Sequence, residues 1–205
     1  MQLIDLKRAQ SLYSKFGTAT EVSGGSGANT IYGLASLGIA TSYIGKVKDD
    51  FLGHRFKSDL LNMNIHYSTH LSNKTNAAET GRCVVLITPD GERSMNTYLG
   101  VTEHLHETDI DIENVRLSEW LYLEGYRFDG PDSEKAFAKA IDLSTPHFLA
   151  ASLADLNADF LPIGTLLPFF HGTIALLVLP NLFFWFLCVG ERGKVMLISI
   201  MYIAA

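Results

Sequence analysis

The chain has 205 residues with 16 basic and 22 acidic side chains, and its formal net charge of −6 argues against a generally basic nucleic-acid binder. Hydrophobic residues make up 47% and charged residues 19% of the sequence, which excludes disorder of the whole chain. Two distant cysteines, Cys83 and Cys188, support neither a disulfide framework nor a thiolate metal site, and the N-terminal sequence MQLIDLKRAQ has no signal-peptide core, so we expect a cytoplasmic protein.

The N-terminal part of the chain begins with two helical patterns. Apolar residues at helical spacing predict a helix over residues 2–16, which Gly17 ends. Residues 23–25 predict a turn, and a second helix follows over residues 26–37. Ser26 is its predicted capping residue, and a glycine follows its end at position 38.

Extended and helical patterns then alternate. Residues 39–47 predict a strand, residues 51–63 a helix and residues 65–71 another strand. Two aspartates, Asp49 and Asp50, stand at the expected start of the helix. Its predicted apolar side consists of Phe51, Leu52, Phe56, Leu60 and Leu61.

The next segment departs from this alternation. Residues 80–100 predict a β-hairpin around a Pro-Asp-Gly-Glu turn, and a short acidic helix follows over residues 105–116. Residues 119–126 predict a strand and residues 131–142 a helix with proline in its first turn. The order predicts an α/β fold with a parallel sheet, and the hairpin, which lies outside the alternation, suits a lid.

Charge falls sharply after residue 142. The first 142 residues hold 14 basic and 19 acidic side chains, whereas residues 143–205 hold 2 basic and 3 acidic ones, with none between Phe160 and Gly190. This apolar tail has three interpretations: a membrane span over residues 161–190, buried core, or out-of-frame translation after a frameshift. Prolines within the apolar stretch argue against a single spanning helix.

The glycine cluster of residues 24–29 is the strongest chemical signal. Gly24 and Gly25 let a ligand approach the backbone, and the N–H groups at the start of the following helix favour anionic or hydroxyl oxygens. Asn29, one turn into that helix, offers both a donor and an acceptor. Together they suit a polyhydroxyl ligand such as a sugar. The alternative is a flexible turn followed by a solvent-facing Asn29.

Histidines and acidic residues form a second pattern near residue 105. His104 and His106 would face one side of a strand and suit a metal there, but no third ligand is evident. Their neighbours are acidic surface residues, so we expect solvated histidines rather than a metal site.

The order of motifs over residues 22–53 resembles the first signature of the PfkB (ribokinase-like) carbohydrate kinase family. The matching features are Gly24 and Gly25, then Asn29, a helix ended by glycine, and the strand leading into IGKVKDDFLG. Lys48 stands where the family usually has glycine. The hairpin sequence TGRCVVLITPDGERSMNTYLG resembles the family's lid strands, and YLEGY its next core strand.

The resemblance implies a ribokinase-like parallel sheet flanked by helices with a small β lid, and its adenosine kinase-like branch matches best. It also implies transfer of the γ-phosphoryl group of ATP, with Mg²⁺, to a hydroxymethyl group of a sugar or nucleoside. Gly24, Gly25 and Asn29 would bind substrate hydroxyls, and Leu99 and Val101 would line the sugar side of the lid. Lid strands pair between subunits in some members, which allows a homodimer.

Several family features have no counterpart in this chain. Members usually begin with a strand that carries a substrate-binding aspartate. Their second half carries an Asn-x-x-Glu motif for Mg²⁺ and phosphate and a Gly-Ala-Gly-Asp motif with the catalytic base, and residues 143–205 contain neither. We therefore expect a partial kinase domain over residues 1–142, incomplete in this chain, and a truncated, inactive kinase whose reading frame is lost near residues 142–146. The alternatives are a non-catalytic sugar-binding remnant and a protein anchored in a membrane through residues 161–190.

Overall fold

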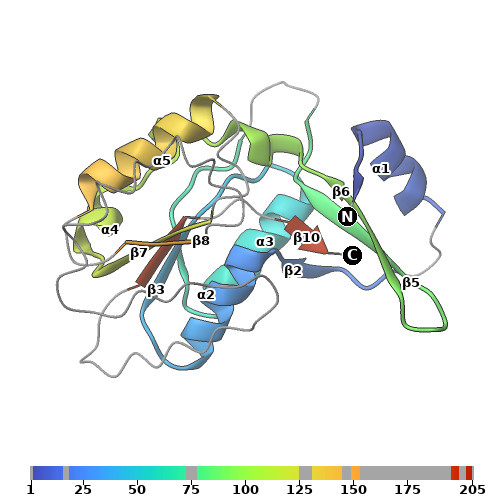
Figure 1. The fold of residues 1–205 in the computed structure, drawn as a ribbon, viewed down its shortest axis with the longest axis horizontal. Helices are drawn as coiled ribbons and strands as arrows, with labels where there is room; N and C mark the ends of the chain where they lie inside the picture. The colour runs from blue at the N-terminus through green and yellow to red at the C-terminus, as the bar shows by residue number, and fades with distance from the viewer. Residues whose placement is uncertain are drawn as a thin grey trace.

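The computed structural model describes residues 2–15, 19–72, 78–124, 131–144, 149–152, 195–198 and 202–204. Within these ranges the chain forms two five-stranded sheets with helices around them (Figure 1). The helices are α1 (Leu6–Tyr13), α2 (Ser26–Ser36), α3 (Phe51–Asn62), α4 (Ile112–Leu117) and α5 (Pro131–Leu143), with short 3₁₀ helices η1 (Gly100–His104) and η2 (Glu107–Asp109).

The first sheet, the mixed sheet, has the strand order β1-β6-β5-β10-β2. Its centre is the predicted hairpin, in which β5 and β6 run antiparallel with Arg82 opposite Tyr98 and Ile87 opposite Arg93. The bounds of its strands are β1 (Gln2–Leu3), β2 (Val22–Gly24), β5 (Arg82–Ile87), β6 (Arg93–Tyr98) and β10 (Tyr202–Ala204). The hairpin prediction is confirmed.

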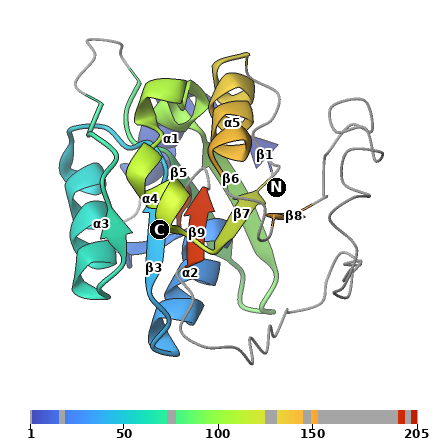
Figure 2. The same ribbon diagram turned by 90° about the vertical axis from the view of Figure 1, so that its left-hand side faces the viewer.

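The second sheet, the parallel sheet, has the strand order β4-β3-β9-β7-β8, and every strand pair in it is parallel. Figure 2 shows β3, β9 and β7 side by side. The bounds of its strands are β3 (Thr41–Ile44), β4 (His66–Tyr67), β7 (Trp120–Glu124), β8 (Leu149–Ser152) and β9 (Val195–Ile198). The predicted α/β architecture is therefore confirmed.

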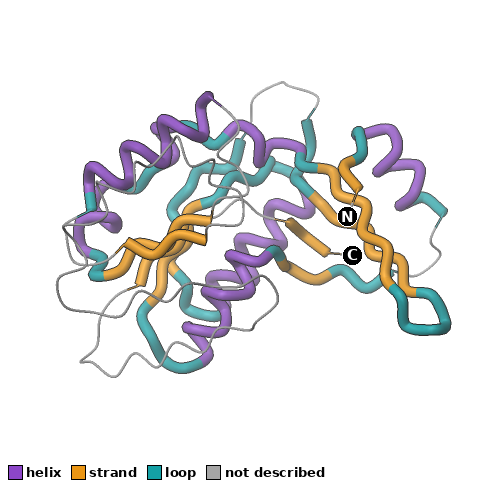
Figure 3. The backbone as a smooth tube through the Cα atoms, viewed as in Figure 1, coloured by secondary structure: helices purple, strands orange, loops and turns teal. Residues whose placement is uncertain are grey.

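Helices cover both faces of the parallel sheet (Figure 3). Neighbouring residues of β3 divide between two cores, because side chains alternate across a strand: Tyr43 packs with Phe56 and Leu60 of α3, whereas Ile44 packs with Phe137 of α5. Burial on both faces is what an α/β sheet with helical connections requires.

Side-chain caps define where several helices begin. Asp5, Asp50 and Asp111 accept hydrogen bonds from the third residue of α1, α3 and α4, respectively. The predicted helix over residues 2–16 is wrong at its start, because Asp5 caps α1 at Leu6 and Gln2–Leu3 pairs with β6 instead.

The predicted acidic helix over residues 105–116 is also wrong. His106 and Asp109 form a reciprocal capping box for η2, and Asp111 caps α4 separately. Local side-chain caps therefore divide this segment into two short helices. The apolar side predicted for α3 is correct only in part: Phe56 and Leu60 are buried, but Phe51 and Leu61 are 71% and 49% exposed.

Several strands are shorter than their patterns predicted. Residues 39–47 form a strand only at Thr41–Ile44, and residues 65–71 only at His66–Tyr67. A strand extends as far as its neighbour pairs with it, and β3 and β4 are matched over two residue pairs. Pairing partners, which the local sequence does not contain, therefore set these strand ends.

The tail supplies three strands to the two sheets. β8 lies at the edge of the parallel sheet, β9 lies between β3 and β7, and β10 lies between β2 and β5. The apolar stretch of residues 161–190, for which a membrane span is one of the three interpretations, lies outside the described residues. Among the helices that the structure describes, none is both long and apolar enough to cross a bilayer.

Candidate functional site

The glycine cluster forms the junction between β2 and α2. Residues 23–25 were predicted to be a turn, but β2 includes Gly24 because this residue pairs with Tyr202 of β10. The chain then turns at Gly25, whose φ of +105° favours glycine, and α2 begins at Ser26. Gly25 rather than Ser26 is thus the capping residue, and it brings no side chain to the first turn of the helix.

Asn29 lies one turn into α2 on its exposed side. Its backbone N–H donates to the carbonyl oxygen of Gly25 at 2.8 Å, and the opposite side of this turn is buried through Gly27 and Ala28. The helix therefore buries its small residues and presents Asn29 at the surface, above the glycine turn. Asn29 is thus solvent-facing, as the alternative interpretation of the cluster expected, and its role in ligand binding stays a prediction.

The hairpin has two roots, the segments just before β5 and just after β6. Leu99 and Val101 lie in the second of these, where the chain leaves β6. Both are buried, with 7% and 3% of their surface exposed. Gly100 between them has a φ of +57°, and a Cβ there would lie 2.2 Å from the carbonyl oxygen of Glu79. This close approach packs the two roots of the hairpin against each other.

The glycine turn and the hairpin belong to one sheet. β10 separates them by a single strand, with Ile203 opposite both Ser23 of β2 and Arg82 of β5. Figure 1 shows β2, β10 and β5 following one another in this order. The mixed sheet therefore fixes the distance between the glycine turn and the hairpin root.

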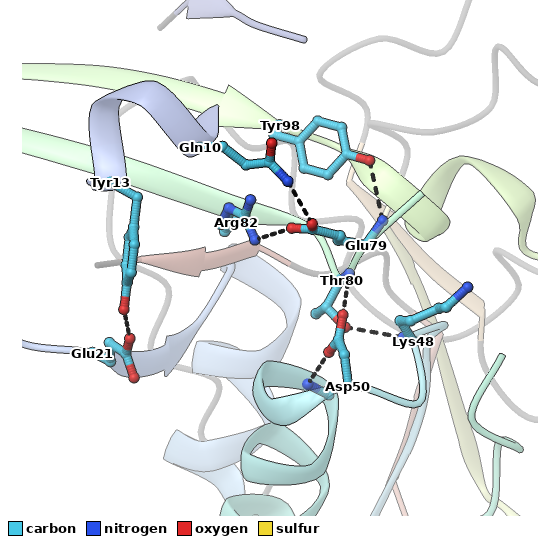
Figure 4. A network of polar contacts seen from close by, with 10 residues as sticks. Gln10, Tyr13, Glu21, Lys48, Asp50, Glu79, Thr80, Arg82 and Tyr98 are labelled. Carbon is cyan, nitrogen blue, oxygen red and sulfur yellow. Dashed lines mark hydrogen bonds and ion pairs between the residues drawn. The ribbon is translucent and has the colours of Figure 1, made fainter. Parts of the chain in front are cut away.

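A polar network joins the hairpin root to α1 and α3 (Figure 4). Asp50 accepts hydrogen bonds from Thr80, and Glu79 accepts one from Gln10 at 2.7 Å and pairs with Arg82 at 2.6 Å. The sequence indicated Asp50 as a residue at a helix start, but its partner 30 residues away gave no local signal.

A shallow groove of about 340 Å³ lies beside β2, between α2 and α3. Its polar side chains bond to one another: Ser23 donates to Asp59 at 2.6 Å and Arg55 pairs with Glu21 at 3.2 Å. Burial, with a smaller contribution from the nearby Asp59 carboxylate, raises the pKa of Tyr32 in this groove to about 12. None of the predicted site residues lines the groove.

The histidine pair does not form a metal centre within the described residues, where no group of three or more His, Cys, Asp or Glu side chains could hold an ion. His106 instead caps η2, and its ring accepts from the backbone N–H of Thr108. The described residues thus offer no cage of three or more ligating side chains for Mg²⁺, and residues 143–205 lack the family's motifs for it.

Comparison with known proteins identifies the family of this α/β fold. The model of the pfkB family carbohydrate kinases matches residues 1–147. A 5-dehydro-2-deoxygluconokinase from Geobacillus kaustophilus is 30% identical over 132 residues, which cover 63% of this chain and 39% of that protein.

Two solved structures are similar over a longer part of the chain. An adenosine kinase from Sinorhizobium meliloti is 41% identical with a TM-score of 0.68, and a probable sugar kinase from Rhizobium etli is 39% identical with a TM-score of 0.67. Each match covers 76% of this chain and 47% of the solved chain. The sequence thus spans about half the length of these relatives, in the ribokinase-like fold.

Proposed function

We propose, from the premise that the chain belongs to the pfkB family of carbohydrate kinases, that it provides the substrate-binding part of an ATP-dependent sugar or nucleoside kinase. The observation that carries the proposal is the mixed sheet, which joins the β2–α2 glycine turn to the hairpin through one strand. A ligand on the glycine turn would therefore lie beside a hairpin suited to cover it.

The proposed substrate contacts come from Gly24, Gly25 and Asn29. With no side chain at Gly25, a sugar hydroxyl can approach the first backbone N–H groups of α2, whose partial positive charge favours an oxygen atom. The exposed Asn29 amide can donate to one hydroxyl and accept from another. These donors and acceptors would bind a ligand with two neighbouring hydroxyl groups more tightly than an apolar ligand.

The hairpin is the proposed lid. Leu99 and Val101 at its root are buried and apolar, which supports a water-poor environment beside the bound hydroxymethyl group. Excluding water there favours phosphoryl transfer to the sugar over hydrolysis of ATP. In a complete kinase, closure of such a hairpin would therefore favour phosphoryl transfer over hydrolysis; in this chain alone the proposed role of the hairpin is to cover the bound substrate.

The phosphate-binding half of the reaction is not part of the proposal for this chain. Residues 143–205 contain neither the Asn-x-x-Glu nor the Gly-Ala-Gly-Asp pattern, and the described residues contain no group of three or more side chains that could hold a metal ion. Positioning and charge stabilisation supply most of phosphoryl-transfer catalysis. We therefore propose that this chain alone binds substrate without turning over ATP.

Binding and turnover measured together test the proposal. We expect calorimetry of the folded chain to detect binding of adenosine, ribose or fructose, and Asn29→Ala to weaken that binding about tenfold, the effect of losing one or two hydrogen bonds. Ser36→Ala, at the far end of the same helix, is the matched control and should bind as the wild type does. ATP consumption with Mg²⁺ should stay at background.

Two results would contradict the proposal. If the folded chain binds none of the three ligands, or if Asn29→Ala binds as the wild type does, the glycine turn is not the substrate site. Substrate-dependent ATP consumption would instead show that the chain contains a phosphate site and a base, and the proposed inactivity would be wrong.

A further inference from the structure

The base of the hairpin is a compact unit made of residues 79–81 and 99–101. The backbone N–H of Val101 donates to the carbonyl oxygen of Glu79 at 3.0 Å, and the N–H of Glu79 donates to the Tyr98 hydroxyl at 3.2 Å. A Cβ at Gly81 would lie 2.5 Å from the carbonyl oxygen of Leu99. Residues 79–81 and 99–101 are therefore in direct contact. A contact that fixes the position of one segment also fixes the position of the other.

One carboxylate fastens this base to α3. Asp50 Oδ1 accepts from the backbone N–H of Gly53 at 2.8 Å and from Thr80 Oγ1 at 2.6 Å, and its Oδ2 accepts from the backbone N–H of Thr80 at 2.8 Å (Figure 4). Thr80 is fully buried, and its Oγ1 also accepts from the N–H of Lys48 at 3.0 Å. Asp50 thus caps a core helix and holds the hairpin base at the same time.

The backbone of α3 approaches the hairpin base closely at this contact. A Cβ at Gly53 would lie 2.0 Å from the carbonyl oxygen of Lys48 and 3.1 Å from Thr80 Oγ1. Since Gly53 is in the first turn of α3, the helix directly contacts the hairpin base. A change in the Asp50–Thr80 contact must therefore displace the base relative to α3.

The same base adjoins the strand pairing that links the hairpin to the glycine turn. Arg82 directly follows the base and pairs with Ile203 of β10. On its other side Ile203 pairs with Ser23, the residue before Gly24. On the other side, Gln10 of α1 donates to Glu79. The base therefore lies between the hairpin, the glycine turn and the core.

We propose that Asp50 and Thr80 are positioning residues for the lid: their contact holds the hairpin base in the position from which the hairpin covers a ligand on the glycine turn. Neither residue touches the ligand in this proposal, which rests on the proposed sugar or nucleoside site. The effect of the pair is transmitted through the base, because the roots of the hairpin move together.

Conservative substitutions separate this role from helix capping. Thr80→Val removes the hydroxyl and retains the shape, whereas Thr80→Ser retains the hydroxyl. In Asp50→Asn one oxygen remains for an amide N–H, but the new NH₂ group must face either the N–H of Thr80 or that of Gly53. Asp5→Asn is the matched control, because Asp5 caps α1 through Arg8 and asparagine caps a helix as well as aspartate does.

Hydrogen exchange of the full-length chain without ligand is the first test. We expect Asp50→Asn and Thr80→Val to speed exchange of residues 79–101 about tenfold, through local opening, and to leave peptides from α4 and α5 unchanged. Thr80→Ser and Asp5→Asn should exchange as the wild type does. Unchanged exchange at the hairpin in Thr80→Val, or equal loosening of hairpin, α4 and α5, would overturn the proposal.

Ligand affinity is the second test. Where the wild type binds adenosine, ribose or fructose, Thr80→Val should weaken binding and Thr80→Ser should restore it; equal affinity of Thr80→Val and wild type would overturn the proposal. If the wild type binds none of these ligands, the proposed function fails, and hydrogen exchange still decides whether the pair positions the hairpin.

Discussion

At the scale of single residues, two helical glycines differ in the space around them. Where a Cβ would lie at Gly33 in α2, the described residues place no atom from outside the helix's own backbone within 4 Å. At Gly53 in α3 the same atom would overlap the carbonyl oxygen of Lys48, at 2.0 Å. Glycine is required at position 53 by the close approach of the backbone, whereas at position 33 it only lowers the stability of the helix.

Alanine at these two positions should therefore have opposite effects. Gly53→Ala must displace the backbone near Lys48, and we expect it to lower the free energy of unfolding by about 1–3 kcal/mol or more. Gly33→Ala should raise that free energy by up to about 1 kcal/mol, since alanine is the better helix former. Urea denaturation of both variants measures the difference, and equal effects would contradict the close contact at Gly53.

At the scale of secondary-structure elements, β9 determines the continuity of the parallel sheet. Its residues Val195–Ile198 pair in parallel with β3 on one side and with β7 on the other. The sequence VMLI is typical of a strand in a parallel sheet, where an uninterrupted apolar run replaces alternation. Without this strand, β3 and β7 would have no hydrogen-bonded neighbour between them.

Proline in β9 tests whether the tail completes the sheet. Leu197→Pro removes a backbone N–H from a strand paired on both sides, and we expect a loss of about 3 kcal/mol or more relative to Leu197→Ala, which retains the N–H. Thermal unfolding followed by circular dichroism measures both variants. If Leu197→Pro unfolds at the same temperature as Leu197→Ala, β9 does not contribute to the stability of the sheet.

At the scale of the whole molecule, stability against acid depends on contacts between distant elements. Asp111 accepts hydrogen bonds from Asn114 in α4 and from His66 in β4. Partial burial raises the pKa of Asp111, but hydrogen bonds from Ser68, Asn114 and His66 outweigh it and lower that pKa to about 2, against 3.8 for the free side chain. The folded protein thus holds this carboxylate in its charged form.

The sign of the pH dependence follows from this lowered pKa. The stabilisation is fully present above about pH 4 and is lost as the pH falls from about 4 to about 2, because protonation removes the charged acceptor. We expect wild type to be more stable than Asp111→Asn at about pH 6 and this difference to shrink toward about pH 2, in denaturation measured across that range. A difference that stays constant with pH would show that the carboxylate charge is irrelevant.

Features set by neighbouring residues were predicted from the sequence, whereas features set by distant strands or by competing caps were not. Local signals predicted Asp50 at the start of a helix, a hairpin within residues 80–100 and the helix that became α5, because capping, turn chemistry and helical periodicity act within a few residues. Strand ends at β3 and β4 were overestimated, since a strand ends where its partner ends. The helix expected over residues 105–116 failed because caps at His106 and Asp111 outweigh its composition.

By itself the sequence determined the α/β class, the chain reversal at Gly25 before a helix, and the resemblance that the family comparison confirmed over residues 1–147. These depend on residue types at fixed spacing, which the linear order carries completely. Only the tertiary structure decided that β9 and β10 enter the two sheets, and that Asp50 bonds to Thr80 at the hairpin base. Such partners lie 30 or more residues apart, where contact depends on how the elements pack and not on any pattern along the chain.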